Sequence, residues 1–279
     1  MSNLYDDLLK LQRIPQAFEN WTRYREALSD FIVSETEPGT TALIVGAGAC
    51  SDFDLPRLCD HFSALWLLDR DDAAVREGIA RQHADIPAER ILRADLLGVP
   101  DETYRAIADD MLALIRAGSA ADRFSQRLED TLIRALENRR PDALLRREGL
   151  ADTVICCGVH SQLATVFLQM TSVYSRYVPI RSDAIEQLLR ERIPGIVSDL
   201  NDALLRWAKR TVILGLEERR IGAEGGIDGA RQAMRDFERR ALAIRAQTRL
   251  VWPFDPAQNK AYTMRITVAE KPIPHAPNV

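Results

Sequence analysis

Lysine is scarce in this chain. Four lysines stand against 33 arginines in 279 residues, yet acidic residues outnumber basic ones by 41 to 37. The two signs alternate, as in residues 69–72, and do not gather into a basic patch. We therefore expect no nucleic-acid partner, and we expect the arginines to lie on solvated helix faces.

Long apolar runs are also missing. No stretch reaches the length of a membrane-spanning helix, so the sequence predicts no membrane partner. The first ten residues carry Asp6, Asp7 and Lys10 and lack the basic-then-apolar pattern of a secretion signal. These features predict a cytoplasmic protein. Apolar residues still make up 46% of the chain, which is enough for a sizeable core.

Cysteine is rare as well. None of the four (Cys50, Cys59, Cys156 and Cys157) forms a C-x-x-C pair. Neither a disulfide framework nor a zinc site is indicated. We expect free thiols, largely buried, in a reducing compartment, and no bound metal.

What the chain does contain is an alternation of short apolar runs and helical patterns. This alternation is typical of a parallel sheet with crossover helices. Asp54 is a candidate N-cap, with Pro56 tolerated in the first turn of the helix that follows. The predicted strands are 41–45, 65–68, 90–93, 153–157 and 211–214, with helices over 54–61 and 72–81 between the first three.

Further helices extend this core. Residues 4–33 form two helical stripes broken at Pro15, and 101–147 is a helical insertion far longer than a crossover needs. Helices are also predicted over 161–170, between Pro179 and Pro194, and over 228–246. The predicted domains are a helical cap (1–39), an α/β domain (40–270) and a tail (271–279).

The most informative segment is the end of the first predicted strand, which runs into Gly46-Ala47-Gly48. Glycines let a backbone approach a ligand closely, and ligands bind at the carboxyl ends of the strands in an open α/β sheet. Asp69 ends the next strand, 21 residues beyond Gly48, where a carboxylate accepts both hydroxyls of a ribose. Asp95 ends the third strand, where it is placed to accept the exocyclic amine of an adenine.

Asp69 and Asp95 also have simpler structural interpretations. Asp69 is equally suited to cap the following helix. Asp95 is equally suited to form a turn before 96–98.

With these features the chain resembles the class I S-adenosylmethionine-dependent methyltransferases over roughly 40–270. Its glycine turn matches the family's glycine motif, Asp69 its ribose-binding acid and Asp95 its adenine-side acid. The resemblance implies S-adenosylmethionine as the cofactor and methyl transfer to a small-molecule or protein acceptor. The cofactor-binding residues implied are Gly46, Ala47, Gly48, Cys50, Asp52, Asp69, Arg70, Asp95 and Leu96.

The end of the chain also fits this family. Two apolar runs, 248–252 and 262–269, lie so close together that they must pair antiparallel, like the family's sixth and seventh strands. The resemblance implies a Rossmann-like, doubly wound α/β sheet of about seven strands, mostly parallel, with this hairpin at its C-terminal end. The N-terminal helices and the insertion are expected to restrict access to the acceptor or to form a dimer contact.

The sequence departs from the family pattern at two positions. Ile44 stands where the family often has an acid, and Cys50 stands at the third glycine position. Asp52 and Asp54 follow the turn, and either is suited to pair with the ammonium of the cofactor. Helix capping explains the same acids.

In this family the acceptor site lies just beyond the fourth strand, which here ends in 158–162. His160 has an ordinary pKa suited to a general base near neutral pH. Gln162, Tyr174 and Trp252 are candidates to line the acceptor pocket. Packing roles are the simpler explanation for each of these residues.

Two other functions are compatible with the sequence. Gly46-x-Gly48-x-x-Ser51 can be interpreted as a degenerate dinucleotide fingerprint of an NAD(P)-dependent oxidoreductase. The other possibility is a protein that binds S-adenosylmethionine without catalysis.

Overall fold

The computed structural model of the chain describes residues 13–139, 146–180, 182–222, 228–240 and 243–271. The first part of the predicted N-terminal helix and the predicted tail beyond Lys271 lie outside the described residues.

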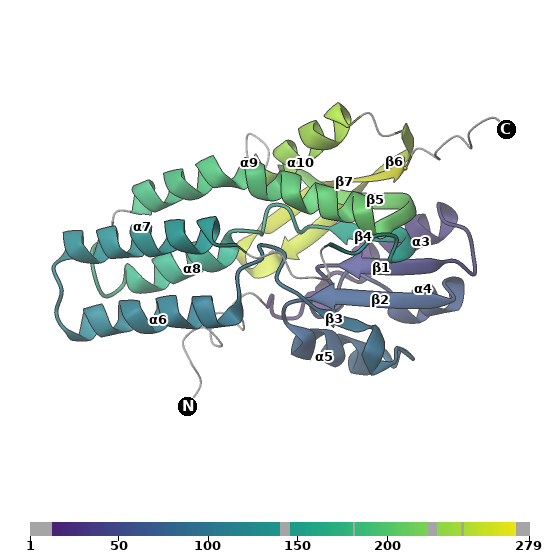
Figure 1. Cartoon of the computed structure of the whole chain (residues 1–279). Coiled ribbons are helices and arrows are strands. Elements are labelled where there is room, and N and C mark those ends of the chain that lie inside the picture. Colours follow the sequence, from purple (N-terminus) through teal and green to yellow (C-terminus); the bar gives the residue numbers. More distant parts are fainter. Residues whose placement is uncertain (1–12, 140–145, 181, 223–227, 241–242, 272–279) are drawn as a thin grey trace.

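A single seven-stranded sheet, in the order β3-β2-β1-β4-β5-β7-β6, forms the centre of the molecule (Figure 1). The first five strands pair parallel, whereas β7 pairs antiparallel with both β5 and β6. The predicted sheet, with its C-terminal antiparallel hairpin, is therefore confirmed. The strands are β1 (Thr41–Val45), β2 (Ala64–Asp69), β3 (Ile91–Arg93), β4 (Ala151–Cys157), β5 (Ala208–Arg220), β6 (Ala243–Asp255) and β7 (Lys260–Glu270).

Both faces of the sheet are buried, which explains why β1 is apolar at nearly every position. Leu43 and Val45 point into one core, and Ala42 and Ile44 point into the other. The first core is covered by α8 (Thr165–Tyr174), α9 (Ser182–Trp207) and α10 (Asp228–Arg239). The second core is covered by α3 (Thr22–Ser34), α4 (Leu55–His61) and α5 (Asp72–Gln82), with the short α2 (Ala17–Asn20) before them.

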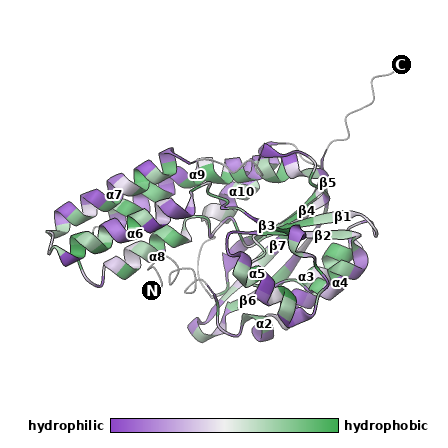
Figure 2. Ribbon diagram, turned by 60° about the horizontal axis from the view of Figure 1, so that its bottom comes forward, coloured by the Kyte–Doolittle hydropathy of each residue, from purple (hydrophilic) through white to green (hydrophobic). Residues whose placement is uncertain are grey.

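Two helices occupy most of the predicted insertion, α6 (Asp101–Arg116) and α7 (Ala121–Glu137). Together with α8 and the first part of α9 they form a lobe toward which the arrowheads of β1 and β2 point (Figure 1). Apolar and polar residues alternate along the lobe helices (Figure 2), and their apolar stripes are fully buried, as at Tyr104 and Phe124. The lobe therefore lies at the carboxyl ends of the strands. No helix among the described residues is long and apolar enough to cross a membrane.

Three predicted helix boundaries are wrong. Helix α9 continues through Pro194 to Trp207, because its apolar face is buried on both sides of the proline. Helix α10 ends at Arg239 and strand β6 starts at Ala243, inside the segment predicted as helix. The helix predicted from Ser161 starts at Thr165, after a turn in which the Gln162 N–H donates to the Val159 carbonyl at 2.9 Å.

Candidate functional site

A pocket of about 850 Å³ opens at the carboxyl ends of β1, β2, β3 and β4. Its size is typical of small-molecule sites, which occupy about 300–1,000 Å³. Three predicted site residues, Cys50, His160 and Tyr174, are not among its lining residues. The predicted residues that line it are Gly46, Ala47, Gly48, Asp52, Asp69, Arg70, Asp95, Leu96, Gln162 and Trp252.

The glycine turn shapes one wall of the pocket. Gly46 has φ +73°, and a Cβ there would lie 2.3 Å from Cγ2 of Val159. Gly48 has φ +49°, and a Cβ there would meet nothing within 4 Å. The two glycines thus serve different purposes, since Gly46 permits a close approach of two loops and Gly48 leaves the backbone open. Cys50 is buried and has φ +52°. It therefore adopts the left-handed backbone conformation that glycine takes up most readily, at the position where the sequence pattern leads one to expect a third glycine.

Asp69, at the end of β2, is hydrogen-bonded to the glycine turn that follows β1. Its Oδ2 accepts a hydrogen bond from the Gly48 N–H at 2.8 Å, and its Oδ1 accepts one from the Asp71 N–H at 2.9 Å. Burial raises the pKa of Asp69, and these backbone donors oppose that rise. The N-cap of α5 is Asp71, whose Oδ1 accepts from the Ala74 N–H at 3.0 Å. Helix capping therefore does not explain Asp69.

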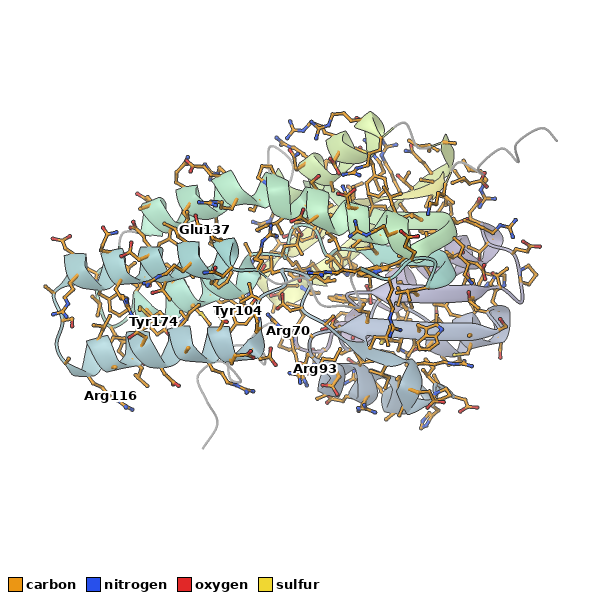
Figure 3. All side chains as sticks on the ribbon, in the orientation of Figure 1. Arg70, Arg93, Tyr104, Arg116, Glu137 and Tyr174 are labelled. Carbon is orange, nitrogen blue, oxygen red and sulfur yellow. The ribbon has the colours of Figure 1, made fainter. Side chains whose placement is uncertain are left out.

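Asp95 lies at the centre of a second polar group. Its Oδ1 accepts from the Leu97 N–H at 2.7 Å, and its Oδ2 accepts from Arg70 Nη1 at 3.1 Å and from the Tyr104 hydroxyl at 3.0 Å. The Arg70 guanidinium also lies 5.2 Å from the centre of the Tyr104 ring. Arg70 and Tyr104 lie where the lobe meets the sheet (Figure 3). Tyr104 does not line the pocket, so the lobe supports this side of it indirectly, through the hydrogen bond from Tyr104 to Asp95.

Asp52 follows the glycine turn, lines the pocket and interacts with the charge of Arg25 of α3. Burial raises the pKa of Asp52 to about 7, although the charge of Arg25 opposes the rise. Arg25 is itself 8% exposed and donates through Nη1 to the carbonyls of Phe18 and Ser51, at 2.6 and 3.1 Å. Sequence reasoning missed Arg25, since one arginine in a helix rich in charge carries no distinguishing signal.

An aromatic cluster of Trp21, Tyr24, Trp252, Phe254 and Tyr262 closes the pocket beyond β4 and β1. Trp252 is its centre, with ring centroids 5.0 Å from Trp21, 5.7 Å from Tyr24 and 4.9 Å from Phe254. The Trp21 indole N–H donates to the Phe254 carbonyl at 3.1 Å. Trp21, Trp252 and Phe254 line the pocket. The N-terminal helices thus contribute Trp21 to the pocket lining, beside the predicted Trp252.

His160 lies away from the pocket and packs against α9 and α10. It is 1% exposed, and its Nε2 is 2.9 Å from Oδ1 of Asn201, whose Nδ2 donates to Asp236 at 2.8 Å. Burial lowers the pKa of His160 to about 4. This imidazole is neutral and enclosed at pH 7, so its surroundings do not support the predicted role of general base.

Tyr174 also lies outside the pocket. Its ring packs against Phe124 in the core of the lobe at 5.8 Å, and its hydroxyl donates to the Ala108 carbonyl at 3.3 Å. Its apolar surroundings give it a packing role, and the predicted place in the acceptor pocket is corrected. Within the described part of the chain, no group of three or more His, Cys, Asp or Glu side chains is arranged to hold a metal ion.

No protein-family model matches the chain, and no curated protein matches it. Among solved structures it is similar to magnesium protoporphyrin IX methyltransferase (ChlM) from Synechocystis PCC 6803 with bound SAH, at 12% identity and a TM-score of 0.46, over 98% of this chain and 89% of that one. It is also similar to the N-methyltransferase NodS from Bradyrhizobium japonicum WM9, at 12% identity and a TM-score of 0.46, over 93% of this chain and 99% of that one.

The strand order distinguishes two kinds of nucleotide-binding sheet. A dinucleotide-binding sheet has the order 3-2-1-4-5-6 with a parallel last strand, whereas here an antiparallel β7 is inserted between β5 and β6. By this topology the chain has the Rossmann-like methyltransferase fold.

Proposed function

We propose that this chain is an S-adenosylmethionine-dependent methyltransferase. One observation carries the proposal: the glycine turn after β1, Asp69 after β2 and Asp95 after β3 surround one pocket at a single edge of the sheet. This arrangement provides an open backbone, a carboxylate for a ribose and a polar group for an adenine in the order that an adenosine ligand requires.

The residues present fit the cofactor. Gly48 leaves its side of the turn open where a Cβ would otherwise project. Asp69 is held in place by two backbone N–H groups, so its remaining acceptor positions are oriented before a ribose arrives. We assign the adenine to Asp95, Arg70 and Leu96, and the ammonium of the methionine end to Asp52.

When bound, the cofactor supplies a methyl group that its sulfonium already activates. The chain's own residues then need to align an acceptor, exclude water and accept a proton. The lobe residue Tyr104 and the N-terminal residues Trp21 and Phe18 reach this pocket or its polar groups. We therefore assign water exclusion to the lobe and the N-terminal helices, and we propose a small-molecule or protein acceptor.

The NAD(P)-dependent alternative is less well supported. In a dinucleotide fingerprint the third glycine allows close packing of the first helix, and here that position is Ser51, which is buried. The close approach in this chain is instead made by Gly78 of α5, where a Cβ would lie 2.2 Å from the carbonyl oxygen of Ala49.

Thermal unfolding in the presence of S-adenosylmethionine and of NAD tests the assignment. A ligand that binds only the native state raises the melting temperature, so we expect a rise with S-adenosylmethionine and none with NAD. The reverse pattern would establish the oxidoreductase. Binding of S-adenosylmethionine that never yields S-adenosylhomocysteine with cell extract would identify a protein that binds the cofactor without catalysis.

A further inference from the structure

Glu217 is a buried acid that the proposed cofactor site does not use. It lies in β5 and is 3% exposed. Its Oε1 accepts a hydrogen bond from the Ser161 hydroxyl at 2.6 Å. Its Oε2 is buried and has no hydrogen-bond partner among the described residues. An unpartnered buried carboxylate oxygen is costly, and a cation or donor that reaches it removes that cost.

Glu217 does not line the pocket itself, but it lies next to a glycine that does. Gly158 lines the pocket at the end of β4 with φ +67°. A Cβ at Gly158 would lie 3.9 Å from Oε1 of Glu217 and 2.9 Å from Cη2 of Trp252. The absence of a side chain at this one position therefore brings a carboxylate and an aromatic ring together at the pocket wall.

Aromatic rings lie beside Gly158 at this wall of the pocket. Trp252 presents the edge of its six-membered ring to Gly158, with Tyr24 stacked on it and Phe254 against it. Burial raises the pKa of Tyr24 and of Tyr262, and the negative charge of Glu217 adds to both shifts. Trp21, Trp252 and Phe254 line the pocket, and aromatic faces attract ammonium groups, most strongly when the site is dry.

The indole of Trp252 beside Gly158 is held by ring packing, without a hydrogen bond among the described residues. Nε1 of Trp252 is buried without a hydrogen-bond partner. Burial raises the pKa of Glu217, and the hydrogen bond from Ser161 opposes that rise.

We propose that the methyl acceptor is an organic amine, whose ammonium is bound by Glu217 and by the aromatic cluster of Trp21, Tyr24, Trp252, Phe254 and Tyr262. This proposal rests on the proposed function. Glu217 takes one proton from the ammonium and the neutral nitrogen keeps its electron pair. That pair forms the new N–C bond as the C–S bond of the sulfonium breaks, and the electrons of the C–S bond stay on sulfur.

The test compares phenethylamine with 2-phenylethanol, which has the same ring and chain length without the cationic group. Binding is measured by calorimetry on the full chain, without and with S-adenosylhomocysteine. We expect phenethylamine to bind at least about tenfold more tightly than the alcohol, with a change in tryptophan fluorescence. Equal affinities, or no saturable binding of phenethylamine, would overturn the proposal.

Two variants assign the preference to the residues. Glu217→Gln is expected to abolish the preference for the amine, whereas the matched control Glu218→Gln is expected to retain it, because Glu218 pairs with Arg249 and Arg265. Phe254→Leu keeps an apolar side chain and removes an aromatic ring. We expect it to weaken the binding of phenethylamine and to leave the binding of 2-phenylethanol unchanged. This variant tests the assignment even if Glu217→Gln fails to fold. An unchanged preference in Phe254→Leu and in folded Glu217→Gln contradicts the assignment.

The same titrations separate this proposal from the one on which it rests. Binding of S-adenosylmethionine without any amine preference refutes the acceptor class and leaves the methyltransferase standing. Amine binding without binding of S-adenosylmethionine refutes the methyltransferase and leaves the amine site standing.

Discussion

A Cβ at Gly78 of α5 would lie 2.2 Å from the carbonyl oxygen of Ala49, so the helix packs directly on the backbone of the glycine turn. No side chain fits at that distance, and the neighbouring atoms are backbone atoms that cannot rotate away. The geometry of the proposed cofactor site therefore depends on a glycine that lies 30 residues beyond it in the sequence.

Gly78→Ala tests this dependence. Glycine to alanine in a helix normally stabilises a protein by about 0.5–1 kcal/mol, but here we expect destabilisation of about 1–3 kcal/mol because the new methyl group displaces the turn. Thermal or urea unfolding measures the change. The matched control is Gly195→Ala in α9, where a Cβ meets nothing within 4 Å and ordinary stabilisation is expected. Equal effects of the two substitutions would contradict the packing argument.

Much of the fold follows from the sequence because the parallel strands are buried on both faces. Their apolar runs, such as 41–45, are continuous and end at turn residues. The edge strand β6 differs, since its outer positions are exposed, and its first residues were predicted as helix. Pro194 predicts a helix end, but buried residues such as Ile196 and Val197 on its C-terminal side keep α9 helical.

The candidate site was less predictable than the fold. Glycines and acids at strand ends are visible in the sequence, since their place follows from strand order. Arg25, Tyr104 and Glu217 reach the site region from helices and from the middle of a long strand. Their placement depends on the packing of distant segments, which no local pattern encodes. His160 follows a strand end as expected, yet its side chain turns into the interface of α9 and α10.

Pro194 gives a prediction about stability. A proline inside a helix removes a backbone hydrogen bond and crowds the preceding turn, which costs about 3 kcal/mol. Pro194 is exposed, so its side chain contributes little packing. We expect Pro194→Ala to raise the free energy of unfolding by about 1–3 kcal/mol in urea titrations. A loss of stability would show that the proline has a packing role.

The proposed role of Asp52 gives a prediction about the pH dependence of cofactor binding. The pKa of Asp52 is raised to about 7 by burial, and a neighbouring cation favours the charged form. Binding of S-adenosylmethionine is therefore expected to strengthen as the pH rises through about 7. Below that pH, binding of the cofactor's ammonium is expected to release the proton of Asp52. Calorimetry in buffers of different ionisation enthalpy measures that release. In Asp52→Asn we expect weaker binding with a flat pH profile, and a retained profile would assign the titration to another group.

His160 is expected to affect stability. Its pKa is lowered from 6.5 to about 4 in the folded chain, so between these values the unfolded state binds more protons. The contribution of His160 to stability is thus fully present above pH 6.5 and is lost as the pH falls toward 4. The pKa of Asp52 is raised, so its contribution to stability changes with pH in the opposite direction over this range. Measurements on the wild type alone therefore do not isolate the effect of His160.

The difference between wild type and His160→Gln isolates it. We expect the stability advantage of the wild type to shrink steadily from pH 7 to pH 4, as measured by urea unfolding at each pH. A constant difference would mean that His160 does not titrate in this range.

The central claim is tested most directly by calorimetric titration of the folded chain with S-adenosylmethionine. The account predicts saturable binding at one site, weakened by about 10- to 100-fold in Asp69→Ala because a hydrogen bond to a charged group is lost. The matched control Asp72→Ala removes an acid that pairs with Arg76 and does not line the pocket, and its affinity is expected to be unchanged. Absence of saturable binding to the wild type, or equal affinities of wild type and Asp69→Ala, would contradict the account.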